Sequence, residues 1–90
     1  HPAERVTTTD NEASVRGSAH LRAGEAVIEL PGAFTARARE SGLTAHVTPT
    51  AACAGLYVAE RSPARLVVRE LSGGRTDASF DFLVVAPLRV

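Results

Sequence analysis

Residues 55–86 read GLYVAERSPARLVVRELSGGRTDASFDFLVVA and form the richest source of core residues in the chain. From Ala78 the pattern alternates, as expected of a β-strand whose successive side chains point to opposite faces. The face expected to meet the core consists of Ala78, Phe80, Phe82 and Val84. The opposite face begins polar and becomes apolar at Leu83 and Val85, so we expect this strand to end covered on both sides.

Two hairpins are predicted within this segment. The turn Ser72-Gly73-Gly74-Arg75 would join a strand at 65–69 to the strand at 78–86, because paired glycines reach positive φ at little cost. Ser62-Pro63 would end the strand at 55–60 and join it to 65–70. The result would be a three-stranded meander.

The upstream sequence predicts further short strands. Residues 13–21 read as a strand broken or bulged at Gly17. Residues 25–30 alternate and end at a Pro-Gly pair, so a hairpin pairing 18–22 with 25–30 is expected. The segment LTAHVTP (43–49) also alternates, with Leu43, Ala45 and Val47 facing inward.

One segment favours a helix. FTARARES (34–41) is rich in helix formers and is followed by Gly42, so we expect a short helical turn, with Phe34 plugging one end of the core. With six to eight short strands, the fold class is all-β, a small antiparallel β-sandwich or barrel. Residues 1–16 would be an N-terminal segment, able to pair with a neighbouring subunit, and 17–90 a single β-domain.

Composition narrows the possible partners and the location. The formal net charge is zero, which argues against a nucleic-acid or anionic-membrane partner. Aromatic residues make up 4% of the chain, so the core is expected to be thin and to gain burial by association with copies of itself. The sequence contains no Met and begins at His1, which favours a leader-cleaved exported protein, extracellular or on a cell or virion surface.

Several segments together resemble a family of β-rich modules from phage tail-fibre-like and bacterial surface fibre proteins. These segments are GSAHL, GEAVIELPGAF, LTAHVTP, GLYVAE, RLVVRE, the Gly-Gly pair and FDFLVVA, over residues 17–86. The resemblance implies a structural or adhesive domain, often a homotrimer, without catalytic residues. The chain departs from the family pattern at Leu66, where an aromatic residue is usual, and at Phe82-Leu83, where Tyr or Trp is common.

The expected function is therefore a non-enzymatic structural subunit of a fibre or phage-like tail, with a receptor- or carbohydrate-binding adhesin tip as the alternative. No catalytic, cofactor or metal residues are assigned, although His1 leaves a periplasmic copper carrier as a distant third possibility. The predicted subunit interface, in a trimer or a filament, consists of Val6, Thr8, Leu83, Val85, Leu88 and Val90.

Other candidate residues receive modest roles. A glycan or receptor is expected to contact Tyr57, Arg37 or Arg39, within loops 31–42, 50–55 and 71–77 or beside them. We expect no chemical role for three other residues. His20 and His46 are predicted to be exposed on strands, and Cys53 is predicted to be a small buried side chain in the core. Asp77 and Asp81 are expected to be solvated or paired with Arg75 or Arg69 across the predicted hairpin.

Overall fold

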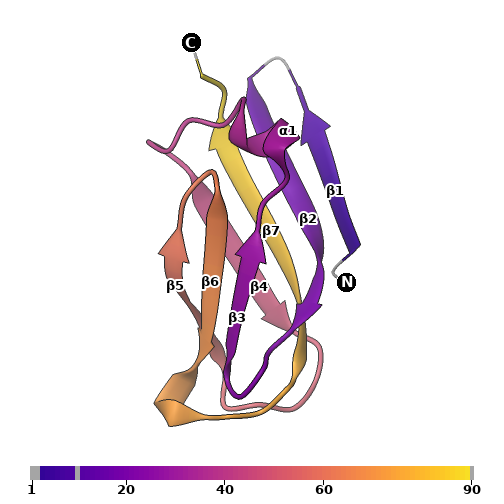
Figure 1. Cartoon of the computed structure of the whole chain (residues 1–90), viewed down its shortest axis with the longest axis vertical. Coiled ribbons are helices and arrows are strands. Elements are labelled where there is room, and N and C mark those ends of the chain that lie inside the picture. Colours follow the sequence, from indigo (N-terminus) through magenta and orange to yellow (C-terminus); the bar gives the residue numbers. More distant parts are fainter. Residues whose placement is uncertain (1–2, 10, 90) are drawn as a thin grey trace.

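Short alternating segments build two antiparallel sheets that pack face to face in a sandwich-like fold (Figure 1). The computed structural model describes residues 3–9 and 11–89. In chain order the elements are β1 (Ala3–Thr8), β2 (Glu12–His20), β3 (Glu25–Glu29), α1 (Gly32–Thr35), β4 (Thr44–Pro49), β5 (Leu56–Arg61), β6 (Arg65–Glu70), the 3-10 turn η1 (Leu71–Gly73) and β7 (Ser79–Pro87). The all-β prediction is confirmed.

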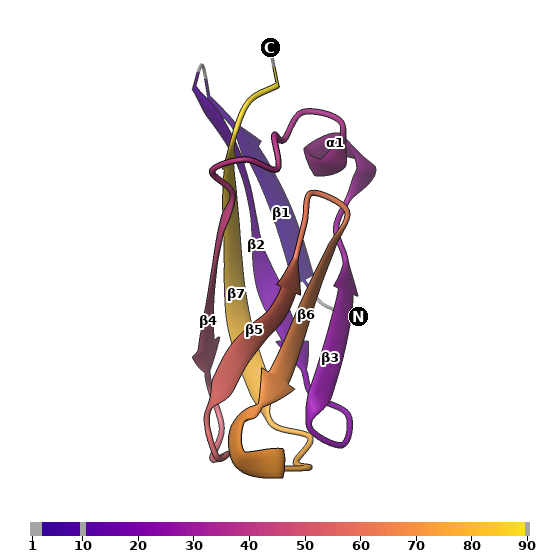
Figure 2. The ribbon, with the colours of Figure 1, turned by 90° about the vertical axis from the view of Figure 1, so that its left-hand side faces the viewer.

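Strand order differs from the chain order. One sheet has the order β1-β2-β7-β4 and the other β3-β6-β5, with every pairing antiparallel. Figure 2, turned by 90°, shows the three-stranded sheet as a layer beside the four-stranded one. The outer strands β1 and β4 therefore form the two edges of the larger sheet.

Alternation places the core as predicted. The inward face of β7, from Ala78 to Ala86, is buried throughout, and Leu66 and Val68 of β6 meet it from the other sheet. Phe34 is fully buried, as expected, and α1 covers one end of the sandwich (Figure 1). The described residues enclose this core by themselves, so a thin core alone no longer requires a partner.

The hairpin expected around the glycine pair is wrong. Strands β6 and β7 lie in different sheets, and residues 71–78 cross from one sheet to the other. The physical reason is Glu70, which is 5% exposed and binds the backbone of the crossing loop at Thr76. Only the β5–β6 hairpin of the expected meander is confirmed, with a bulge between Val58 and Glu60.

The hairpin expected between 18–22 and 25–30 is also wrong. A single bridge joins Arg22 to Glu25, and β2 and β3 belong to different sheets. Ala23 and Gly24 both have positive φ, which turns the chain sharply toward the second sheet. The N–H of Gly24 then donates to Thr76 in the crossing loop, 2.9 Å away.

Two local predictions need correction. Strand β2 continues through Gly17 without a bulge, because it is paired in unbroken register on both sides, with β1 and with β7. The helix spans Gly32–Thr35 rather than 34–41, because the N–H of Arg39 donates to Pro87 (2.8 Å) and draws the chain into the strand layer.

The N-terminal strand finds its partner within the chain. Strand β1 pairs with β2 from Ala3–Ser18 to Thr8–Ala13, so a neighbouring subunit is not needed to order it. Strand β2 crosses position 16, the expected boundary of the N-terminal segment.

Candidate functional site

The outer face of the four-stranded sheet carries a row of side chains that crosses all four strands. Register places Arg5 of β1, Arg16 of β2, Leu83 of β7 and His46 of β4 side by side. All four side chains are exposed, and Leu83 is 37% exposed at the centre of the row. The row joins two guanidinium groups to an apolar patch and an imidazole.

The next row along the strands adds oxygen atoms. Here Ser18, Asp81 and Thr48 are register neighbours, and the Ser18 hydroxyl donates to Oδ1 of Asp81 over 2.7 Å. Together the two rows line an open groove of about 630 Å³, closer to an exposed surface than to an enclosed cavity. Its chemistry is mixed: cations at one side, hydroxyl and carboxylate oxygens at the other.

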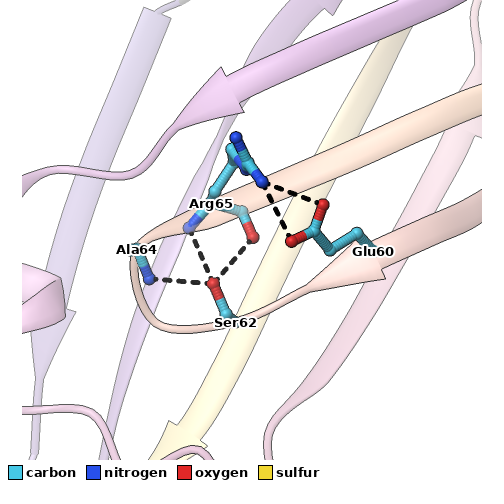
Figure 3. A network of polar contacts seen from close by, with 4 residues as sticks. All are labelled: Glu60, Ser62, Ala64 and Arg65. Atoms are coloured by element: carbon cyan, nitrogen blue, oxygen red, sulfur yellow. Dashed lines mark hydrogen bonds and ion pairs between the residues drawn. The ribbon is translucent and has the colours of Figure 1, made fainter.

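Arginines on the two outer faces differ in their partners. On the three-stranded sheet, Arg69 binds Glu25 over 2.8 Å, and Arg65 binds both oxygens of Glu60 at 3.0 and 3.1 Å (Figure 3). Within the described residues, Arg5 and Arg16 form no ion pair. Positive charge is therefore ion-paired on the outer face of the three-stranded sheet. In the groove, the two described arginines form no ion pair and outnumber the lining carboxylate, Asp81.

The β5–β6 turn shows how the compensated face is built. Figure 3 shows the Ser62 hydroxyl at the centre of this turn, where it accepts the N–H groups of Ala64 (3.3 Å) and Arg65 (3.1 Å). This holds Arg65 beside Glu60, and hydrogen bonding to that carboxylate raises the pKa of the Arg65 guanidinium. The pair is a surface contact between side chains that are 45% and 50% exposed, so it contributes little to stability.

Within the described part of the chain, no strand pairs with the outer sides of β1 and β4, the edges of the four-stranded sheet. Thr50 donates its N–H to Ser79 over 2.9 Å, so Thr50 and Ser79 form a hydrogen-bonded pair. Bonded and non-bonded pairs alternate in antiparallel sheets, so this pair shows which residues of β4 are hydrogen-bonded to β7. By this alternation, the backbone groups of Ala45 and Val47 face away from β7. The backbone of Pro49 also faces away from β7, as expected of a residue that has no N–H to donate to a neighbouring strand.

Strand β1 follows the same rule. Thr9 donates its N–H to Glu12 over 2.8 Å, so the pairs Thr7–Ser14 and Arg5–Arg16 are the bonded ones. The backbone groups of Val6 and Thr8 then face the open edge.

Glu70 anchors the end of the sandwich opposite α1. Its carboxylate accepts the backbone N–H of Ala54 (2.8 Å), and the backbone N–H (2.9 Å) and hydroxyl (2.8 Å) of Thr76. These bonds, first that from Ala54, lower the pKa of Glu70 although burial opposes them. Both oxygens are occupied, so Glu70 has a structural role.

The predicted interface residues do not form one surface. Val6 and Leu88 are half-buried against the chain's own core, whereas Thr8 is exposed on the β1 edge strand. Leu83 and Val85 are neighbours on the outer face of β7, where Leu83 is exposed and Val85 half-buried. Val90, the sixth predicted residue, lies outside the described residues.

The predicted ligand contacts are also dispersed. The backbone beside Arg37 and Arg39 bonds the C-terminal residues Arg89 and Pro87 near α1. Tyr57 lies opposite Arg69 on the three-stranded sheet, 42% exposed. Loops 50–55 and 71–77 meet around Glu70, but loop 31–42 belongs to the opposite end, so the three loops do not form one tip.

The remaining candidates have local roles. His20 and His46 are exposed on strands, and Cys53 is half-buried against the core. Asp77 and Asp81 are exposed, as one alternative of the prediction had it, but the arginine pairing is not found among the described residues. Asp77 instead accepts the N–H of Ala23 (2.9 Å), and Asp81 accepts the hydroxyl of Ser18. Across residues 3–9 and 11–89, no three His, Cys, Asp or Glu side chains gather as a metal ion would require. His1 lies outside these ranges.

Sequence reasoning missed the arginine pair. Alternation along 13–21 places Arg16 on the outward face, but nothing local indicates that Arg5 is its partner across the ladder. That contact depends on register between strands, which the sequence pattern alone does not fix for polar faces.

No protein-family model matches the chain, and neither does any curated protein or solved structure. The resemblance to fibre modules therefore stays a prediction from the sequence. Among the described residues, no helix has the length and apolar character needed to cross a membrane.

Proposed function

We propose that this chain is a non-enzymatic structural module of an extracellular fibre or phage-like tail, joined to copies of itself through the edges of its four-stranded sheet. The observation that carries the proposal is that, among residues 3–9 and 11–89, no strand pairs with the outer side of β1 or of β4. An uncovered edge is a template for another strand, since its N–H and C=O groups lack partners.

Strand direction favours open-ended growth. The order β1-β2-β7-β4 is antiparallel throughout, so β1 and β4 run in opposite directions. A second copy in the same orientation can therefore place its β4 antiparallel to β1 of the first. Such a head-to-tail contact leaves one free edge at each end and generates a filament when the rotation does not close.

The other sheet discourages the same contact. The bulge between Val58 and Glu60 distorts the β5 edge, and Glu25 and Glu29 place charges along β3. Bulges and charged residues are established ways of blunting edges. Strand β4, TAHVTP, carries no Asp, Glu, Lys or Arg, although Pro49 blunts its end, and β1 carries Glu4 and Arg5 but no bulge.

Sedimentation velocity with negative-stain microscopy tests this proposal. We expect concentration-dependent oligomers of the wild type, and their loss in Thr8→Pro and Ala45→Pro, which remove edge-facing N–H groups. Val27→Pro is the matched control, because Leu30 N–H bonds Ala64 and thereby places the N–H of Val27 on the open β3 edge.

A wild type that stays monomeric at micromolar concentration would contradict the proposal. So would equal loss of assembly in all three proline variants, each verified as folded by circular dichroism.

The alternative, a carbohydrate-binding adhesin domain, gains support from a different observation. The groove on the four-stranded sheet brings together oxygen atoms and two arginines that form no ion pair within the described part of the chain. This alternative uses the sheet's face, whereas assembly uses its edges.

A further inference from the structure

We infer that the groove on the outer face of the four-stranded sheet binds a carboxylate-bearing polysaccharide. This goes beyond the proposed assembly and does not depend on it, because every element of the groove belongs to a single copy.

The arginine pair indicates the charge of the ligand. Arg5 and Arg16 are direct partners in the bonded register of β1 and β2, and like charges directly opposite each other destabilise a sheet. Among the described residues neither arginine forms an ion pair, and one lining carboxylate, Asp81, leaves the groove with more positive than negative charge. A carboxylate between the two guanidinium groups would relieve the repulsion and accept charge-assisted hydrogen bonds.

The second row indicates a sugar rather than a simple anion. The Asp81 carboxylate keeps acceptor capacity beyond the Ser18 bond, and Thr48 adds a hydroxyl beside it. Sugar hydroxyls donate to such oxygens. An acidic sugar therefore matches both rows, whereas a small inorganic anion would gain nothing from Asp81.

The apolar centre of the groove and its extent across the sheet also fit a polysaccharide. Leu83 presents an apolar surface between Arg16 and His46, suited to the C–H face of a sugar ring. The groove has contributions from β1, β2, β7 and β4, so it crosses the full width of the sheet. A site open along its length accepts an internal segment of a polymer, not only a chain end.

Isothermal titration with oligogalacturonates tests the inference, using the fully methyl-esterified oligomer as the matched ligand without charge. We expect wild type to bind the acidic form, more weakly as salt rises, and not the ester. Arg5→Gln with Arg16→Gln should reduce the affinity about tenfold or more, given the strength of charge-assisted bonds.

The matched protein control is Arg22→Gln with Arg61→Gln, which removes the same charge from two exposed positions outside the groove. Its affinity should stay within about twofold of wild type. Equal loss in both double variants, equal binding of the ester, or no binding of the acidic oligomer would overturn the inference.

Dextran sulfate separates a sugar-acid site from a general anion patch. Binding as tight as that of oligogalacturonate would overturn the carboxylated-glycan assignment. The Thr8→Pro variant separates this inference from assembly, because a non-assembling protein should still bind the acidic oligomer.

Discussion

At the scale of single residues, one carboxylate and one glycine hold the crossing loop in place. Glu70 bonds two loops at once, through Ala54 and Thr76. Gly24 has φ +86°, and a Cβ there would collide with the carbonyl oxygen of Gly74. Both residues act by directing the chain between the two sheets.

Glu70→Gln should lower the melting temperature at pH 7. An amide has one oxygen where the carboxylate has two acceptors, so its NH₂ group would face the N–H of Ala54 or of Thr76. Thermal unfolding followed by circular dichroism measures the change. Glu29→Gln, at an exposed position, is the control and should melt with wild type.

Acid should remove the stabilisation that Glu70 provides. Its folded-state pKa lies below the ordinary 4.5, so the stabilisation is complete above pH 4.5 and is lost as the pH falls through the folded value. Urea unfolding of wild type and Glu70→Gln from neutral to acidic pH should show the two curves converging. A constant difference across this range would contradict the assignment.

Gly24→Ala should destabilise the fold by about 2 kcal/mol or more, since it combines a positive φ with a backbone collision. Gly32→Ala is the matched control: its Cβ meets nothing within 4 Å, and alanine favours the helix. Urea denaturation measures both variants. Similar losses in the two would contradict the role given to Gly24.

At the scale of elements, the strand faces follow from local patterns and the pairings do not. Ala78, Phe80, Phe82 and Val84 are all buried, because alternation depends only on neighbouring residues. The glycines at 72–75 correctly predict a turn, but they wrongly predict that the strands on either side of it pair as a hairpin. What redirects it is Glu70, whose partners lie far away in the sequence.

The same limit applies to the candidate site. The outward position of Arg16 follows from alternation, whereas its pairing with Arg5 requires knowing which strand lies beside β2 and in what register. The open edges likewise depend on strand order, so the sequence indicates self-association without locating it.

Phe34→Ala should cost about 3–5 kcal/mol, because the ring of this four-residue helix is fully buried at the end of the core. Tyr57→Ala removes an aromatic ring that is 42% exposed and should cost much less. Chemical denaturation compares them. Equal costs would show that α1 is not held by its ring.

At the scale of the whole molecule, the free edges predict an alternating pattern of amide exchange. In the monomer, the amides of Val6 and Val47 should exchange quickly, and those of Thr7 and His46 slowly, since only the latter face a partner strand. Assembly should slow the first pair. Hydrogen exchange followed by NMR measures this, and uniform protection in the monomer would contradict the edge assignment.

The groove runs from the β1 border to the β4 border, the two borders at which modules are proposed to meet. Modules joined at these edges would place the end of one groove against the start of the next, so that the grooves form one continuous binding surface. A polyanionic strand lying along that surface would hold many weak contacts at once, and detachment would require their simultaneous release. The avidity of the fibre for the polymer would then increase with the number of modules, while the affinity of each single module remained low.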